Sequence, residues 1–222
     1  MLEQRGWLSW QPPELRAAVL RAGRLVTLGR RETLSREGDD DPRMFGIVSG
    51  FFGCSISHRH GYPVLGTLLG PGDWFGEGPL VEDNGRRQVT FSAMQSASVL
   101  VINSAAMTSL RSTFPDLDRR VAALATWQVR YLTEVASELL VENVADRIVA
   151  VLLRLCADLP APVLLPVVQD ELGEMSNASR NSVNKILRTL AALGLVRCGY
   201  GGIEVFDPRR LSHWYESRIL GE

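Results

Sequence analysis

A segment near the C-terminal end of the chain carries side chains suited to reading DNA. If residues 180–190 are helical, one face is aliphatic, with Val183, Ile186, Leu187 and Leu190. The opposite face then carries the polar and basic set Arg180, Asn181, Asn184, Lys185 and Arg188. Arginine donates in pairs to O6 and N7 of guanine, asparagine pairs with N6 and N7 of adenine, and lysine binds phosphate or guanine. This helix face therefore indicates contact with the DNA major groove.

The residues just before that face predict a helix-turn-helix. A short amphipathic stretch has Leu172 and Met175 on its apolar side, and Gly173 is small enough to admit another helix. Asn177 stands where a tight turn needs a left-handed backbone, which asparagine tolerates better than most residues. Ser179 is a suitable N-cap for the second helix. These signals place the polar face on a helix whose N-terminal residues reach base edges.

Residues 194–206 follow with two short apolar runs around a glycine-rich turn, which predicts a β-hairpin wing beside the second helix. Arg197 in this wing is suited to contact phosphate. The alternative is a solvated charged face on an ordinary helical hairpin, but the succession of turn, cap, basic face and hairpin favours DNA. The predicted DNA-contacting set is Ser179, Arg180, Asn181, Asn184, Lys185, Arg188 and Arg197.

The charge distribution agrees with a local DNA-binding patch. The formal net charge is −1, so the total gives no sign of nucleic-acid binding, yet every charged residue from Ala178 to Arg197 is basic. Hydrophobic residues make up 45% and charged residues 22%, as in an ordinary soluble globular protein. No apolar run approaches the roughly 20 residues of a membrane span, and Arg5, Glu14 and Arg16 interrupt any signal-peptide pattern. We therefore expect a cytoplasmic protein that does not bind membranes.

The N-terminal half predicts β structure after a short helix. Pro12 and Pro13 precede residues 14–20, which suit a helix because proline is tolerated in the first turn. From Leu25 to Ile102, short apolar runs alternate with glycine-rich breaks, a spacing typical of a β-sandwich or barrel. The chain therefore falls in the α+β class.

A long helix is expected to follow, from Pro115 to about Val141, and then a helix from about Val144 to Leu159 and a proline-rich break. The long helix is apolar on more than one face, so one seam could pack on the β domain and the other on a second copy of the helix. The alternative is a plain core helix. The residues predicted for the dimer interface are Val121, Leu124, Gln128, Tyr131, Leu132, Val135 and Leu139.

These predictions divide the chain into a β domain over residues 1–115, a dimerisation helix over 116–143 and a DNA-binding domain over 144–222. One recognition helix contacts few base pairs, so useful specificity normally requires two half-sites about one DNA turn apart. We therefore expect a homodimer on a palindromic double-stranded DNA operator.

Several motifs together resemble the cyclic-AMP receptor protein/FNR (Crp/Fnr) family of bacterial transcription regulators. They are Glu37-Gly-Asp39, residues 44–50, Gly70-Pro-Gly-Asp-Trp-Phe-Gly-Glu77, residues 146–153, residues 178–187 and Gly-Gly-Ile-Glu-Val-Phe-Asp207. The resemblance runs through nearly the whole chain. It implies an N-terminal effector-binding β-roll (a double-stranded β-helix or jelly roll), a long dimerisation helix and a C-terminal winged helix-turn-helix, with RNA polymerase as a further candidate partner.

The resemblance also implies an effector site. In cyclic-nucleotide binders of the family, a Gly-Glu pair contacts the ribose and phosphate, and an Arg-Ser pair holds the phosphate. Here Gly76, Glu77 and Arg87 match, whereas Gln88 replaces the serine. In the long helix, Thr133 falls where cyclic-AMP binders place a polar residue against adenine. Cyclic AMP and cyclic GMP are thus candidate effectors; another ligand, none, or a structural Glu77–Arg87 ion pair are the alternatives.

Other classes of function find less support in the sequence. The three cysteines lie far apart, and none precedes Cys54, which argues against an iron–sulfur cluster. His58 and His60 are close enough for a weak metal site, but an exposed hairpin tip is the simpler reading, so no metal site is predicted. Cys54 has no neighbour in sequence that would support a redox role. No catalytic set stands out, so we do not expect an enzyme. A cyclic-nucleotide-binding module that acts through protein partners is the alternative function.

Overall fold

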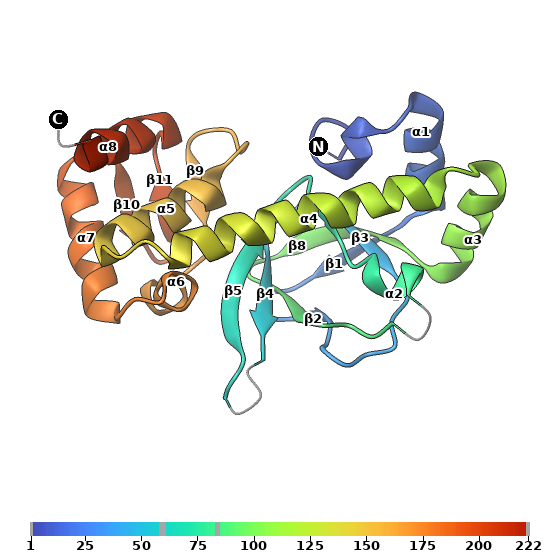
Figure 1. The fold of residues 1–222 in the computed structure, drawn as a ribbon, viewed down its shortest axis with the longest axis horizontal. Helices are drawn as coiled ribbons and strands as arrows, with labels where there is room; N and C mark the ends of the chain where they lie inside the picture. Colours follow the sequence, from blue (N-terminus) through green and yellow to red (C-terminus); the bar gives the residue numbers. More distant parts are fainter. Residues whose placement is uncertain (1, 58–60, 83–84, 221–222) are drawn as a thin grey trace. The chain divides into compact units, whose positions relative to one another are not determined.

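The strands of the N-terminal half form two four-stranded antiparallel sheets, as the alternation of apolar runs and glycine breaks predicts. A computed structural model describes residues 2–57, 61–82 and 85–220 (Figure 1). Contacts divide the chain into two units, one of residues 1–63 and 68–131 and the other of residues 64–67 and 132–222.

The described residues of the first half of the chain form eight short strands, with helices before, between and after them. In chain order they are η1 (Trp7–Trp10), α1 (Pro13–Ala22), β1 (Arg24–Leu28), β2 (Thr33–Ser35), β3 (Met44–Ser49), β4 (Phe52–Ile56), β5 (Val64–Leu69), β6 (Trp74–Phe75), α2 (Gly78–Val81), β7 (Thr90–Ala93), β8 (Ala97–Ile102), α3 (Ser104–Thr113) and the start of α4 (Leu117–Leu139). The sheets have the strand orders β1-β8-β3-β6 and β2-β7-β4-β5.

One hydrophobic core joins the two sheets. Phe45 and Ile47 of β3 lie in it together with Phe91 of β7, which belongs to the other sheet. The rings of Phe75 and Phe91 also bridge the sheets, with centroids 4.3 Å apart. Because both sheets bury one face in a shared core, the domain is the predicted β-roll.

A second core covers the other face of the β1-β8-β3-β6 sheet with helices. Trp7 of η1, Val19 of α1 and Leu110 of α3 pack there with Val121 and Leu124 of α4. The indole nitrogen Nε1 of Trp7 donates a hydrogen bond to the carbonyl of Arg120 at 2.7 Å, which attaches the N-terminal segment to α4. Burying each aliphatic side chain stabilises the fold by about 1.5–3 kcal/mol.

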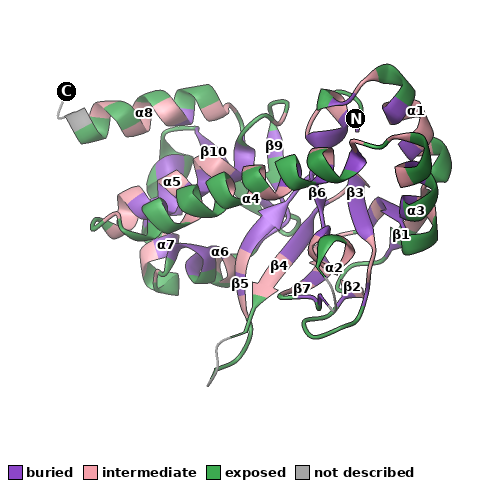
Figure 2. Ribbon diagram, turned by 45° about the vertical axis from the view of Figure 1, so that its right-hand side comes forward, coloured by how far each residue is buried: buried purple, intermediate pink, exposed green. Residues whose placement is uncertain are grey.

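This core corrects part of the dimer prediction. Val121 and Leu124 are each 1% exposed within the first unit, so their side chains cannot form a surface for a second copy. The predicted seam that contains them is the one that packs on the β domain. Of the other predicted interface residues, Leu132 and Leu139 are 56% and 42% exposed, and Val135 is half-buried. Figure 2 shows the long exposed surface of α4.

The second unit holds the end of α4 and a three-stranded sheet among helices. Its further elements are α5 (Val144–Cys156), β9 (Val163–Leu165), α6 (Gln169–Ser176), α7 (Arg180–Ala192), β10 (Val196–Gly199), β11 (Gly202–Val205) and α8 (Pro208–Leu220). The strand order is β10-β11-β9, with Arg197 opposite Glu204. Helix, turn, helix and hairpin therefore occur as predicted, whereas β9 and α8 were not anticipated.

The unit boundary falls inside α4, between Tyr131 and Leu132. The dimerisation helix predicted over residues 116–143 is therefore shared between the two units, and its first half completes the core of the β domain, as predicted for one of its seams. The end of α4 is held in the second unit by Glu138, whose carboxylate lies 2.9 Å from Nε of Arg154 on α5. In the described part of the chain, no helix is both long and apolar enough to cross a membrane.

Candidate functional site

Helix α7 exposes the polar face predicted for DNA contact. Ser179 caps its N-terminus, since its hydroxyl oxygen accepts from the backbone nitrogen of Ser182 at 3.2 Å. The aliphatic face is buried in the second unit and consists of Val183, Ile186, Leu187 and Leu190. The opposite face is exposed at Arg180, Asn181, Lys185 and Arg188 and half-buried at Asn184. The structure thus brings the predicted helix residues together on one accessible face.

The turn before α7 requires two particular residues. Asn177 ends α6 in the left-handed conformation, with φ 45° and ψ 52°, as predicted. A Cβ atom at Gly173 would lie 2.7 Å from the carbonyl oxygen of Ala178, closer than real contacts permit. The close approach of α6 to this turn therefore depends on glycine at position 173.

Arg147 of α5 holds the same turn in place. This buried guanidinium donates from Nε to the carbonyl of Ser176 at 2.6 Å and from Nη2 to the carbonyl of Asn177 at 3.0 Å. Its third bond runs from Nη1 to the carbonyl of Val141 at 2.5 Å. One cation thus satisfies carbonyls at the C-terminal end of α6 and just beyond α4, where negative partial charge accumulates.

The wing carries Arg197, which is exposed and forms an ion pair across the hairpin. Its Nη2 lies 2.6 Å from Oε2 of Glu204, and its guanidinium lies 5.7 Å from the centre of the Phe206 ring. A groove of about 540 Å³ between α7 and the wing is lined by Asn184, Arg188 and Arg197, among others. At the start of α7, Nε of Arg180 lies 3.5 Å from Oδ1 of Asp170, and both side chains are exposed. A pair exposed on both sides, such as Arg180–Asp170, is weak.

In the β-roll, Glu77 is buried where the predicted effector site lies. It precedes the short helix α2, and its Oε2 accepts from Nε2 of Gln128 on α4 at 3.0 Å. Burial raises the pKa of the Glu77 carboxyl, while its hydrogen bonds and the charge of Arg87 act in the opposite direction. Gln128 and Tyr131, both predicted for the dimer interface and both half-buried, thus contact the β domain, Tyr131 through its hydroxyl, which donates to the carbonyl of Leu68 at 3.3 Å, and their interface role stays a prediction.

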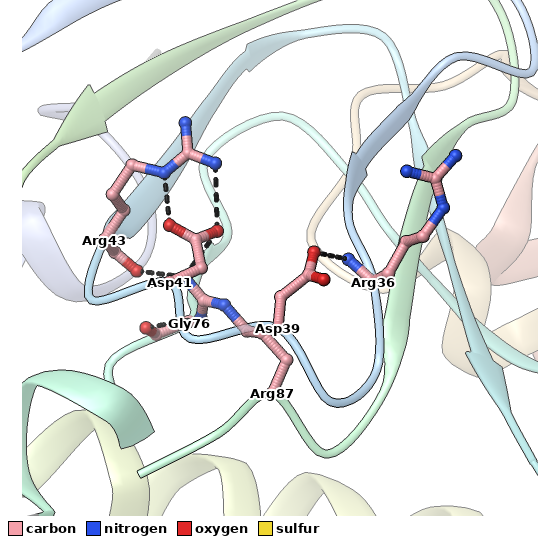
Figure 3. A network of polar contacts seen from close by, with 6 residues as sticks. All are labelled: Arg36, Asp39, Asp41, Arg43, Gly76 and Arg87. Atoms are coloured by element: carbon pink, nitrogen blue, oxygen red, sulfur yellow. Dashed lines mark hydrogen bonds and ion pairs between the residues drawn. The ribbon is translucent and has the colours of Figure 1, made fainter. Parts of the chain in front are cut away.

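Arg87 lies in a closed network beside Gly76 (Figure 3). Its Nη1 donates to the Gly76 carbonyl at 2.7 Å, and its Nη2 donates to the Arg43 carbonyl at 2.5 Å. The same Nη2 lies 3.4 Å from Oδ2 of Asp41, and the guanidinium stacks 4.9 Å from the centre of the Phe45 ring. Gly76 has φ +87°, and a Cβ there would lie 2.6 Å from Nη1 of Arg87, so only glycine fits.

The ion pair considered between Glu77 and Arg87 is not the arrangement found among the described residues. Glu77 bonds to Gln128, whereas the carboxylate paired with Arg87 is Asp41. Gln88 is exposed, and its Nε2 donates to the carbonyl of Arg86 at 3.1 Å. Thr133 is exposed on the part of α4 that belongs to the second unit. The structure therefore groups Gly76, Glu77 and Arg87 within the first unit, and effector contacts by Gln88 and Thr133 stay predictions.

The remaining candidates are those for redox and metal chemistry. Burial raises the pKa of the Cys54 thiol to about 12, which keeps it protonated and poorly reactive at neutral pH. His58 and His60 lie outside the described residues. Within the described ranges, no group of three or more His, Cys, Asp or Glu side chains is placed to hold a metal ion.

The sequence did not point to Asp41 or Arg147, although Arg147 lies in the motif of residues 146–153 and Asp41 lies between the motifs of residues 37–39 and 44–50. Asp41 is the last of three consecutive aspartates, a pattern typical of a solvated turn, and its partner Arg87 is 46 positions away. Arg147 follows Asp146 inside an apolar helix. A basic residue within a run of core residues is the one signal that could have marked it as a buried hydrogen-bond donor.

Two family models match the chain, one in each half. The model of the cyclic nucleotide-binding domain matches residues 25–114, and that of the Crp-like helix-turn-helix domain matches residues 146–214. The two ranges account for most of the chain, and they contain the β-roll network and the exposed face of α7, respectively.

Known regulators are similar over most of the chain. The cyclic AMP receptor protein of Thermus thermophilus is 29% identical over 175 residues, which cover 79% of this chain and 80% of that protein. The CRP-like cAMP-activated global transcriptional regulator of Mycobacterium tuberculosis is 24% identical over 218 residues, which cover 96% and 97%.

Solved structures share the fold. FixK2 from Bradyrhizobium japonicum superposes with a TM-score of 0.71 at 17% identity, covering 86% of this chain and 96% of that one. The c-di-GMP-responsive global regulator CLP of Xanthomonas campestris has a TM-score of 0.66 at 22% identity, covering 88% and 100%. With a β-roll, a long helix and a winged helix-turn-helix in this order, and with matching domain models in both halves, the chain belongs to the Crp/Fnr family of transcription regulators.

Proposed function

We propose that this protein is a homodimeric transcription regulator that binds a palindromic DNA operator through α7 and responds to a small effector in its β-roll. The observation that carries the proposal is the exposed face of α7, on which Arg180, Asn181, Lys185 and Arg188 follow the N-cap Ser179. The buried face of the same helix fixes its orientation, so these side chains are presented by a rigid element.

The first turn of α7 is the part suited to reading bases. Arg180 and Asn181 lie there, and the N-terminal residues of a recognition helix are those that reach base edges. Arg180 is suited to guanine and Asn181 to adenine, while Lys185 and Arg188, one and two turns further along, are suited to phosphate. Arg197 on the wing extends the basic surface to the next stretch of backbone.

Exposed aliphatic residues on α4 support dimerisation. Leu132 and Leu139 are seven residues apart, so they lie on the same helix face, two turns from each other. Water-exposed leucines at this spacing are the pattern of a two-helix seam, and a dimer brings two copies of α7 to two half-sites. RNA polymerase, the further partner expected of such a regulator, would contact the complex once it is on DNA.

The β-roll site around Gly76, Glu77 and Arg87 is the proposed place of the effector. Relatives are named as cAMP-activated regulators, and cyclic AMP and cyclic GMP are therefore the first ligands to test. A ligand controls DNA affinity only if it binds the DNA-competent and the incompetent states unequally.

Fluorescence anisotropy with a pool of labelled palindromic duplexes tests this function, with and without each nucleotide and over a range of salt concentrations. We expect sequence-dependent binding whose affinity falls steeply as salt rises, because phosphate contacts release counterions. Tighter binding with one nucleotide supports the effector assignment. No binding under any condition, even at low salt, would contradict the DNA function and favour a module that acts on protein partners.

A further inference from the structure

The positive charge of the Arg87 guanidinium is balanced by a carboxylate of the same domain. Asp41 supplies the carboxylate, with Oδ2 at 3.4 Å from Nη2 of Arg87. The same carboxylate receives two bonds from Arg43, one from Nε to Oδ1 and one from Nη2 to Oδ2 at 2.9 Å. Asp41 thus contacts two cations at once (Figure 3).

The pair is closed to solvent. The Arg87 side chain is only 2% exposed and that of Asp41 11%. The Phe45 ring stacks against the guanidinium, and the carbonyls of Gly76 and Arg43 hold its two terminal nitrogens. An anion from solution therefore cannot reach Arg87 unless this arrangement opens.

One donor in the closed arrangement has no acceptor. Among the described residues, Nε of Arg87 is buried without a hydrogen-bond partner. A buried unpaired N–H is costly, and an anion with two oxygens can take Nε and a terminal nitrogen together, which is the favoured geometry for phosphate on arginine. The closed state therefore leaves Nε unused, a donor that an anionic ligand could satisfy together with a terminal nitrogen of the same guanidinium.

We propose that Asp41 is a resident counter-ion of the effector site, which holds Arg87 closed and admits a phosphate-bearing ligand only when its carboxylate is displaced. The proposal deepens the proposed function, since it rests on the effector site being at Gly76, Glu77 and Arg87. It makes Asp41 the residue that sets the affinity of this site for phosphate.

The chemistry follows from competition between two anions for one cation. A carboxylate built into the fold has the advantage of proximity, whereas a phosphate must be ordered from solution and must expel Asp41. Replacing Asp41 by asparagine keeps the size and the hydrogen-bonding oxygen but removes the charge. Arg87 then lacks its paired carboxylate, and free phosphate no longer competes with Asp41 for Nη2.

Thermal unfolding of the full chain in inorganic phosphate is the direct test, with chloride at the same ionic strength as the reference. The variant Asp41→Asn should melt about 3–6 °C higher when phosphate exceeds its dissociation constant about tenfold. Wild type should show no phosphate-specific shift. Asp40→Asn, which removes an exposed charge from the same loop, is the matched control and should behave as wild type.

Calorimetric titration with cyclic AMP and cyclic GMP extends the test to nucleotides. We expect Asp41→Asn to bind at least one of them about tenfold or more tightly than wild type, which is a difference of ~1.4 kcal/mol. Equal affinities of wild type and Asp41→Asn for phosphate and for both nucleotides would overturn the proposal.

A double variant keeps the test decisive if Asp41→Asn folds poorly. Asp41→Asn/Arg87→Gln removes both buried charges and should fold in chloride without a phosphate effect. If Asp41→Asn folds only with phosphate, the anion has replaced the carboxylate as proposed. If it stays unfolded in phosphate while the double variant folds, phosphate cannot take the place of Asp41 and the proposal fails. Binding of wild type to DNA is measured separately, so failure here is distinguishable from failure of the proposed function.

Discussion

Nε of Arg147 donates a hydrogen bond to the backbone carbonyl of Ser176 at 2.6 Å, so α5 is tied directly to the end of α6. Two further bonds of the same guanidinium, to the carbonyls of Asn177 and Val141, extend this clamp. The turn that orients the recognition helix is thus fixed by a side chain that does not belong to the helix-turn-helix itself.

Arg147→Met should therefore destabilise the second unit. The substitution retains much of the aliphatic volume but removes every donor, and leaving the buried carbonyl of Ser176 unsatisfied costs about 1–3 kcal/mol, to which the lost bonds of the part-buried Asn177 and Val141 carbonyls add. We expect the free energy of unfolding to fall by about 2–4 kcal/mol in urea denaturation followed by circular dichroism. The exposed Arg209→Met on α8 is the control and should change it by less than about 0.5 kcal/mol. Equal stability of both variants would show that the clamp contributes nothing.

Gly173→Ala should disturb the same turn by crowding. The added Cβ would lie 2.7 Å from the carbonyl oxygen of Ala178, and a backbone atom cannot move aside as a flexible side chain does. We expect a loss of about 1–3 kcal/mol, the usual cost of overpacking, together with weaker DNA binding. Gly199→Ala in the wing meets nothing within 4 Å and is the matched control. A Gly173→Ala protein with the melting temperature and DNA affinity of wild type would contradict the close packing.

The helix-turn-helix was predictable because its signals are local. A serine cap, an asparagine that accepts a left-handed backbone and an aliphatic face at helical spacing all lie within 20 residues, so neighbouring positions suffice to read them. Strand β9 escaped notice because Val163–Leu165 is three residues long among prolines, and it becomes a strand only by pairing with β11. Such pairing is a tertiary effect that no local pattern contains.

The long helix α4 shows a different limit of prediction from sequence. Periodicity indicates that a helix face is apolar but does not identify what covers it. Val121 and Leu124 are covered by the N-terminal helices of their own chain, and Gln128 and Tyr131 bond to the β domain. The partner of Arg87 could not be predicted for a related reason, because Asp41 approaches it only through the fold of two distant loops.

The exposed leucines of α4 predict that one acidic substitution will separate the dimer. In Leu132→Asp, a charge would replace a leucine that is 56% exposed in one chain, and burying it in an interface without a partner is costly. Analytical ultracentrifugation should show a monomer at concentrations where wild type is a dimer. Ala123→Asp is the control, since residue 123 is exposed about two and a half turns earlier, on the opposite side of the helix. A Leu132→Asp dimer as stable as wild type would place the interface elsewhere.

The buried carboxyl of Glu77 predicts a pH dependence of stability. Burial raises its pKa in the folded state above the unfolded value, which is about 4.3. The contribution of Glu77 to the free energy of unfolding is most favourable when the pH is below the pKa in the unfolded state. That contribution is lost as the pH rises through the higher pKa in the folded state. Glu77→Gln carries no charge at any pH, so its melting temperature relative to wild type should increase from about pH 4 toward pH 7.

Thermal melting curves of Glu77→Gln and wild type between about pH 4 and pH 7 show whether the difference in melting temperature changes in the expected direction. Glu82→Gln, at the exposed end of α2, controls for the loss of one negative charge. If Glu77→Gln instead loses stability relative to wild type as pH rises, the ionised carboxylate must be favoured by its surroundings. Glu77 would then be a structural anion rather than a strained buried acid.

The most direct test of the DNA-reading face compares Arg180→Ala with wild type on an operator selected from the palindromic pool. Fluorescence anisotropy should show a loss of about 1–3 kcal/mol in binding free energy on that operator, with relaxed preference at the contacted base pair. Arg30→Ala, which removes an exposed arginine before β2, should leave both quantities unchanged. An Arg180→Ala protein with the affinity and sequence preference of wild type would contradict the assignment of α7 as the recognition helix.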